Sequence, residues 1–269
     1  MATSTTTIPP TSAPSWLAAV TLAERELVRF FRQKNRVFGA LGQPIIFWLL
    51  FSEGLKGNDL DYTHFFPGTL VMILLFTAIF ATISIIEDRR EGFLQSVLVA
   101  PAPRWAMVAG KIGGGAAIAM LQALLFLALG WFTLPLESSF FEILQAVILM
   151  GVIAVALTSL GFLLAWRMDS TAGFHAIMSV FLLPMWLLSG AFFPAGSDGV
   201  LGWIVRINPL TYGVSGLRHY LRFASENSAA ATEPLASLPL CWIVSLAFAA
   251  IMFAASWKIA ATRSTGDLL

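Results

Sequence analysis

Long apolar runs, separated by short polar stretches, dominate the chain and predict six membrane-spanning helices. The runs cover about residues 37–55, 65–86, 112–134, 143–166, 174–193 and 238–259. Each is close to the roughly 20 residues that an α-helix needs to cross the hydrocarbon core of a bilayer. The pattern therefore indicates an all-α polytopic membrane protein, in which residues 37–269 form one domain of six transmembrane helices.

Two of these runs contain a proline away from their ends, and we expect a helix kink near each. Pro44 lies in the first run and Pro184 in the fifth. Proline removes one backbone hydrogen bond from a helix, and a membrane helix tolerates this only where neighbouring groups satisfy the freed carbonyl.

Two further segments precede the first apolar run. Residues 1–14 are rich in Thr, Ser and Pro, which predicts a disordered tail. In residues 15–36 apolar side chains recur at helical spacing, and most charges fall elsewhere on the helical wheel. We therefore expect an amphipathic interfacial helix that can lie in the membrane plane. The residues alone leave two roles open for it: a plain interfacial anchor, or a surface that docks on a partner.

A charged island, residues 87–111, separates the second and third apolar runs. Its charged residues are Glu87, Asp88, Arg89, Arg90, Glu91, Arg104 and Lys111. The apolar residues that share one helical face within it are Phe93, Leu94, Val97 and Leu98. Pro101 and Pro103 follow and end the helix. A short amphipathic helix is therefore predicted at about residues 87–103, and its apolar face needs cover from either the lipid interface or a partner protein.

The connection between the fifth and sixth runs, about residues 196–225, is too apolar for an ordinary loop. Asn208 and Pro209 divide it into two halves, each too short to cross a bilayer. We predict two short helices that form a re-entrant pair in the outer leaflet, packed against protein because irregular backbone at membrane depth needs polar partners. The alternative is a pair of interfacial helices that lie flat.

The distribution of Lys and Arg predicts the orientation of the chain. With the N-terminus in the cytoplasm, the inside segments hold twelve of these residues and the outside segments hold four. Because positive residues accumulate in cytoplasmic loops, we expect both termini and the charged island in the cytoplasm. The protein is then a multi-pass protein of the cell membrane, in contact with the lipid bilayer.

Composition supports a membrane protein and excludes several other classes. Hydrophobic residues make up 58% of the chain and charged residues 12%, whereas a soluble domain carries about 25% charged residues. A net charge of +1 gives no reason to expect a nucleic-acid partner. Cys241 is the single cysteine, so no disulfide can form within the chain. The three histidines lack the spacing of a metal site, and no hydrolase motif is present, so we expect neither a metal nor a catalytic residue.

The residues around Lys111 resemble a phosphate-binding loop only superficially. In that loop the pattern is GxxxxGK followed by Ser or Thr, but Trp105 occupies the position of the first glycine and Ile112 follows the lysine. We therefore expect no nucleotide or cofactor site in this chain. Gly110 and Gly114 have another use, since a small-xxx-small pair allows a second helix to approach closely.

Three stretches have a recognisable pattern. Residues 65–111 show a Pro-Gly entry, an acidic-basic exit, a Gly-Phe-Leu turn, an Ala-Pro break and a Gly-Lys pair. The second stretch is LLSGAFFP at 187–194 and the third is NPLTYGVSGLRHYL at 208–221. Together they resemble the permease subunits of type-2 ATP-binding-cassette (ABC) exporters, in the branch that includes antibiotic-resistance and nodulation-factor exporters.

This resemblance implies a partner and a role for the charged island. It implies a homodimer or pseudo-dimer of six-helix subunits, each docked on a cytoplasmic ATPase subunit that binds ATP and Mg. Residues 87–103 would be the coupling helix that sits in a groove of the ATPase, and the N-terminal helix would touch the same subunit. The residues implied in coupling are Glu87, Asp88, Arg89, Arg90, Glu91, Gly92, Phe93, Leu94, Pro101 and Arg104. Those implied at the N-terminal interface are Arg25, Arg29 and Arg32.

The transport path follows as a hypothesis. The spans that contain Pro44 and Pro184 are candidates for lining it, and the segment around Asn208 is the candidate outer gate. The gate residues are Asn208, Pro209, Tyr212 and Arg218. A drug-like molecule, a lipid and a glycan all remain open as the exported substrate, because the expected path is apolar and unspecific. Two other classes compete, a passive channel or pore and a membrane-embedded transferase, although we find neither a row of pore-lining polar residues nor a catalytic cluster.

Overall fold

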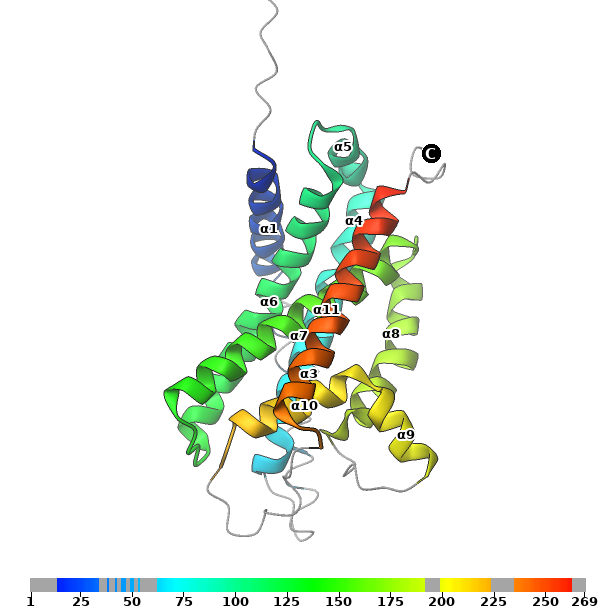
Figure 1. The fold of residues 1–269 in the computed structure, drawn as a ribbon. Coiled ribbons are helices and arrows are strands. Elements are labelled where there is room, and N and C mark those ends of the chain that lie inside the picture. Colours follow the sequence, from blue (N-terminus) through cyan, green and yellow to red (C-terminus); the bar gives the residue numbers. More distant parts are fainter. Residues whose placement is uncertain are drawn as a thin grey trace, which may run out of the picture.

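Among the residues that the computed structural model describes, five helices are long and apolar enough to cross a membrane (Figure 1). The structure describes residues 14–33, 62–191, 199–223 and 235–262, with single residues between 38 and 53. The five helices cover Thr63–Arg90, Arg104–Thr133, Phe140–Trp166, Thr171–Ala191 and Leu238–Ala261. They confirm the last five predicted runs as helices of a multi-pass membrane protein. The first predicted span, residues 37–55 with Pro44, and the predicted tail lie outside the described ranges.

The central helix is α3 (Tyr62–Ala81), which continues after a turn at Thr82 into α4 (Ile83–Arg90). It contacts α6 (Arg104–Thr133), α7 (Phe140–Trp166), α8 (Thr171–Trp186) and α10. Of its most apolar 18 residues 94% are buried, compared with 11% in α11 (Leu238–Ala261). The core of the bundle is therefore built around α3, while α11 turns most of its apolar surface outward.

The N-terminal helix α1 (Ser15–Arg32) lies alongside α6 (Figure 1). Ala19 faces Gly110 and Ala23 faces Gly114, so closely that a Cβ added to either glycine would come within 3.0 Å of an α1 carbonyl oxygen. Further along, Phe30 packs with Ile118. The small-xxx-small pair therefore does permit a close approach, and its partner is α1.

The expectation that α1 can lie in the membrane plane stays a prediction, and the structure shows that α1 runs alongside α6. Contacts advance along both helices in the same direction, from residues 19 and 110 to residues 30 and 118, so α1 follows the axis of a membrane-spanning candidate. α6 has 30 residues and is about 45 Å long at 1.5 Å per residue, well beyond the roughly 30 Å of the hydrocarbon core. α1 therefore packs against the N-terminal part of α6, a helix longer than the hydrocarbon core is thick.

The charged island is divided among three helices, α4, α5 and α6, and residues 87–103 are not one helix. Residues 87–90 complete α4, and only α5 (Phe93–Val99) stands apart. The division occurs at Gly92, whose φ of 76° lies in the left-handed region. Its amide donates to the Arg89 carbonyl and the Glu91 amide to the Glu87 carbonyl, which ends α4 in the manner of a glycine cap. Residues 100–103 then lead into α6.

Two short helices, α9 (Val200–Ile207) and α10 (Pro209–Tyr220), lie at the end of the bundle opposite α5 (Figure 1). The predicted break at Asn208 is confirmed: its backbone is extended, and its Oδ1 accepts the Leu210 amide at 3.0 Å as the cap of α10. The predicted kink near Pro184 falls later. α8 continues helically to Trp186, and the following π-type turn η1 (Leu187–Ala191) loses helical backbone at Leu188 and Gly190. We call these two ends of the molecule the α5 end and the α9 end.

Gly110→Ala is expected to destabilise the protein, whereas Gly113→Ala is expected to leave it unchanged or stabilise it. A Cβ at Gly110 would stand 2.6 Å from the Ala19 carbonyl oxygen, while Gly113 on the same helix has open space around it. Overpacking costs about 1–3 kcal/mol, and an unobstructed Gly→Ala change in a helix gains about 0.5–1 kcal/mol. Thermal unfolding in detergent and protease cleavage within α1 would measure the difference. Equal behaviour of the two variants would contradict the docking of α1 on α6.

Candidate functional site

A buried group of charged side chains joins three helices at the α5 end. We call it the Asp88 cluster, and its members are Arg25, Glu26 and Arg29 of α1, Glu87 and Asp88 of α4, and Lys111 of α6. Asp88 is 0%, Glu26 4% and Lys111 5% exposed. The Lys111 Nζ donates to the Asp88 carboxylate and, at 2.5 Å, to Glu26 Oε1. Buried charges of this kind are stable only when each has a partner.

Two arginines of α1 complete the set of partners around Asp88. Arg25 binds both carboxylate oxygens, at 2.8 and 3.1 Å, in the two-pronged geometry that suits a guanidinium. Arg29 donates to Asp88 Oδ1 at 2.7 Å and to Glu87 Oε2 at 2.8 Å. The cluster thus contains three cations and three carboxylates and is electrically balanced.

Arg25 also connects the cluster to α5. Its guanidinium lies over the ring of Phe93, 3.7 Å from the centroid, a cation–π contact. Burial by itself lowers the pKa of Arg25. The hydrogen bond and the negative charge of Asp88 raise this pKa by more than burial lowers it, so it lies above the ordinary arginine value. The side chain is therefore a permanent cation that holds α1, α4 and α5 together.

The next two charges of the island bind the turn between α7 and α8. Arg89 donates to the carbonyl oxygens of Trp166 and Met168, at 2.5 and 3.2 Å. Arg90 donates twice to the Asp169 carbonyl, at 3.0 and 2.7 Å. The last carbonyls of a helix have no partner within it, so these arginines serve as the cap of α7 and fix the turn to α4.

Arg104, the last charge before the glycines, ties α6 to α11. Its Nη1 donates to the Ala260 carbonyl at 2.7 Å, close to the end of α11. Residues 87–111 therefore bind three other parts of the chain: α1, the α7–α8 turn and the end of α11. The island is a hub within the chain.

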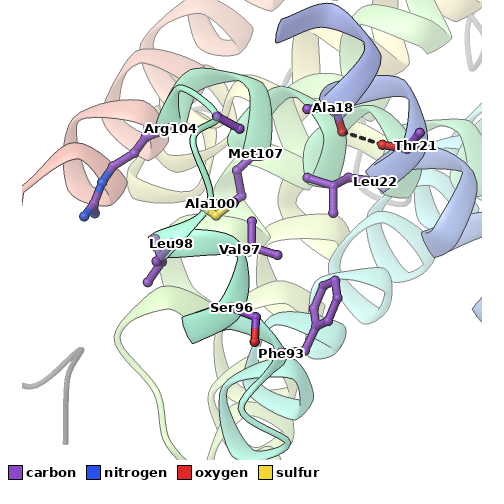
Figure 2. A pocket seen from close by; sticks show the side chains of 11 residues that line it. Ala18, Thr21, Leu22, Phe93, Ser96, Val97, Leu98, Ala100, Arg104 and Met107 are labelled. Atoms are coloured by element: carbon purple, nitrogen blue, oxygen red, sulfur yellow. Dashed lines mark hydrogen bonds between the residues drawn. The ribbon is translucent and has the colours of Figure 1, made fainter. Parts of the chain in front are cut away.

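The apolar face predicted for the island packs in part on the chain itself. Leu94 is buried in the main core, and Val97 and Leu98 pack against that core. Beside them, α1, α5 and the start of α6 enclose a groove of about 300 Å³. Figure 2 shows Leu22, Val97 and Met107 around this space, with the Thr21 hydroxyl bonded to the Ala18 carbonyl at its edge.

The outward surface of α5 is almost free of charge. Val99 is 76% and Trp105 43% exposed. The other exposed residues from 92 to 105 are Gln95, Ser96, Ala100 and Pro101. We call these six residues the neutral tip. Glu91, just before it, is exposed, and Arg32 lies on a polar groove beside α1.

The predicted gate residues lie together at the α9 end, mostly in structural roles. Asn208 is buried and donates to the Met185 carbonyl at 2.5 Å, which ties α10 to α8. Pro209 is the first residue of α10, and the Tyr212 hydroxyl donates to the Arg206 carbonyl at 2.9 Å. Arg218 is half-buried, and its Nε and Nη2 have no hydrogen-bond partner among the residues that the structure describes.

Sequence reasoning missed two members of the site, Glu26 and Asp169, and gave Lys111 no coupling role. A signal was present for Glu26. It lies three residues after Ala23 and four before Phe30, which places a carboxylate within the apolar stripe of an amphipathic helix. Such a residue needs a buried cation, and Lys111 is the one that the fold brings to it.

Apolar membrane-length helices joined at one end by a buried ionic hub define a multi-pass membrane protein. The chain belongs to the ABC-2 type transporter family, whose family model matches residues 18–221.

Curated relatives carry related names. The inner membrane transport permease YadH of Escherichia coli K12 is 26% identical over 76% of this chain and 82% of its own. The putative transport permease ycf38 of Cyanophora paradoxa is 24% identical over 73% and 71%. The probable multidrug ABC transporter permease YbhR of Escherichia coli K12 is 28% identical over 57% and 42%.

Asp88→Asn is expected to destabilise the protein by about 3–5 kcal/mol, the cost of leaving buried charges without their partner. Three cations converge on Asp88. The matched control is Glu91→Gln, because the Glu91 side chain is 61% exposed and 3.5 Å from Arg29, and surface pairs contribute only about 0–1 kcal/mol. Thermal unfolding in detergent measures both. The double variant Asp88→Asn/Lys111→Met should recover part of the loss, and no recovery would argue against direct pairing.

Proposed function

We propose that this chain is the permease subunit of an ATP-driven exporter, and that a separate ATPase subunit binds at its α5 end. Family membership and relatives named as transport permeases support membrane transport as the activity. The observation that supports coupling is the hub, in which one short segment holds α1, the α7–α8 turn and the end of α11.

Because of the hub, a force applied at α5 would also move the helices that are bound to it. When an ATPase closes on ATP and displaces α5, the Asp88 cluster carries α1 and α6 with it, and Arg89, Arg90 and Arg104 carry the other helix ends. Packed interiors shift as rigid bodies, because their contacts do not deform continuously. The helices therefore move together, and a path opens between this chain and a second copy in a homodimer.

Charge distribution supports a cytoplasmic α5 end. The Lys and Arg residues described there are Arg25, Arg29, Arg32, Arg89, Arg90, Arg104, Lys111, Arg167 and Lys258. Those at the α9 end are Arg206, Arg218 and Arg222. Cytoplasmic segments carry the excess of positive charge, so ATP would act from the α5 side and substrate would leave at the α9 side.

The chemistry of the docking surface follows from which charges are already used. Glu87, Asp88, Arg89 and Arg90 bind partners within this chain, so they are not free to pair with an ATPase. The neutral tip remains, with Val99 and Trp105 as its exposed apolar groups. Binding energy at interfaces comes mainly from a few apolar anchors that lose their water. The ATPase would accordingly offer an apolar groove.

Val99→Asp is expected to remove most of the ATPase that co-purifies with the permease, because a carboxylate cannot enter an apolar groove unpaired. Glu91→Gln, eight residues away on the exposed side, is the control and should retain it. The measurement is the molar ratio of ATPase to permease after purification in mild detergent, at low and high salt. Binding through the neutral tip should persist at high salt, whereas screening weakens contacts between exposed charges.

Two outcomes would refute different parts of this proposal. A wild-type permease that never co-purifies an ATPase and transports without ATP would refute the exporter. Full ATPase binding by Val99→Asp, with binding lost at high salt, would instead leave the exporter in place and refute the neutral tip as its docking surface.

A further inference from the structure

A second set of contacts ties helices together at the α9 end, between the α6–α7 connection and the chain that leaves α10. Leu136 and Phe223 pair as an antiparallel bridge. The Glu137 amide donates to the Arg222 carbonyl at 2.9 Å, and the Arg222 amide donates to the Ser138 hydroxyl at 2.8 Å. We call these contacts the outer staple.

Aromatic packing anchors the staple to the core. The Phe223 ring stands edge-on to Phe66 of α3, with ring centroids 5.7 Å apart, and Phe66 stacks on Phe126 of α6 at 4.9 Å. Phe66 also fills the space above Gly130, where an added Cβ would come within 2.2 Å of the ring. The segment after α10 is thus fixed to α3 and α6.

Other contacts hold α10 itself to its own bundle. Gly213 and Gly216 let it lie directly against Ile153 and Leu149 of α7. The His219 ring binds the Ala236 carbonyl at 2.8 Å, just before α11. By contrast α9 has exposed apolar side chains on much of its surface, namely Val200, Trp203, Ile204 and Ile207. α10 is thus packed into the bundle, whereas α9 lies at its edge.

We infer that α10 moves as one body with α6 and that the Ser138 hydroxyl, the Arg222 backbone and the Phe223 ring fix it there. α6 begins at Arg104, five residues after Val99 at the exposed end of α5, and ends at Thr133, just before the staple. One helix therefore carries displacement from the α5 end to α10. This inference rests on the proposed function only in taking α5 as the point where displacement begins. An outer opening would then form at the edge that carries α9, and not by separation of α10 from the α6–α7 connection.

The two polar parts of the staple differ in importance. The Arg222–Glu142 ion pair is short at 2.6 Å, but the Arg222 side chain is 61% exposed, and such pairs contribute little. The backbone bond to Arg222 and the hydrogen bond from its amide to the buried Ser138 hydroxyl do not depend on the Arg222 side chain. Position 222 can therefore be changed without opening the staple.

A reversible cross-link tests the inference. Glu137→Cys/Arg222→Cys, in a Cys241→Ser background, places thiols on two exposed residues that face each other across the bridge. Opposed residues of an antiparallel pair have Cα atoms about 4.5–5.5 Å apart, within the range that a disulfide spans. Oxidised protein, reconstituted with its ATPase, is expected to transport substrate within about twofold of the reduced protein, on the view that the two segments do not separate. The single-cysteine variants under the same oxidant are the controls.

Loss of transport on oxidation, restored by a reductant, would overturn the inference while leaving the exporter intact. A second readout needs no transport. In the isolated permease, the amide hydrogens of Glu137 and Arg222 should exchange slowly with solvent, because both are hydrogen-bonded. Exchange as fast as that of an unstructured loop would overturn the staple directly, whether or not an ATPase partner exists.

Discussion

The carboxylate of Asp88 is fully buried, and the arrangement of the α5 end depends on keeping it paired. An unpaired ion in a protein interior costs several kcal/mol even after relaxation. Lys111, Arg25 and Arg29 supply the pairing, and they come from α6 and α1. α1, α4 and α6 therefore cannot separate without exposing a charged group to water or leaving one buried without a partner. An apolar contact would hold them less strictly, since apolar surfaces slide past each other without leaving an unpaired group.

Around this pairing, the remaining charges of the island have a common purpose. Arg89 and Arg90 satisfy carbonyls at the end of α7, and Arg104 satisfies one at the end of α11. A segment rich in charged residues thus folds into a hub whose exposed side, the neutral tip, is mostly uncharged. Under the proposed coupling to an ATPase, this division would separate two tasks: docking by apolar contact, and transmission by buried ionic contact.

Local patterns predicted the helices well, because apolar periodicity and helix-ending residues act over a few positions. The last five spans, the break at Asn208 and the close approach allowed by Gly110 and Gly114 all follow from such patterns. The partners of the charges could not be predicted in this way. Asp88 and Arg25 are 63 positions apart, and nothing local distinguishes an arginine that binds this chain from one that binds an ATPase. Similarly, the apolar face of the island predicts that something covers Leu94 but not that the core of the same chain does.

The central claim is that the Asp88 cluster and its neighbouring arginines hold the α5 end as one body during transport. Spin labels on cysteines at Glu24 of α1 and Asp169 of the α7–α8 turn, in a Cys241→Ser background, report the distance between two elements that the hub connects. Double electron–electron resonance on the reconstituted complex should give the same narrow distance distribution with and without ATP, and a broader one in the Asp88→Asn variant. A distance that changes with ATP in the otherwise unaltered protein, or one indifferent to Asp88→Asn, would contradict the account.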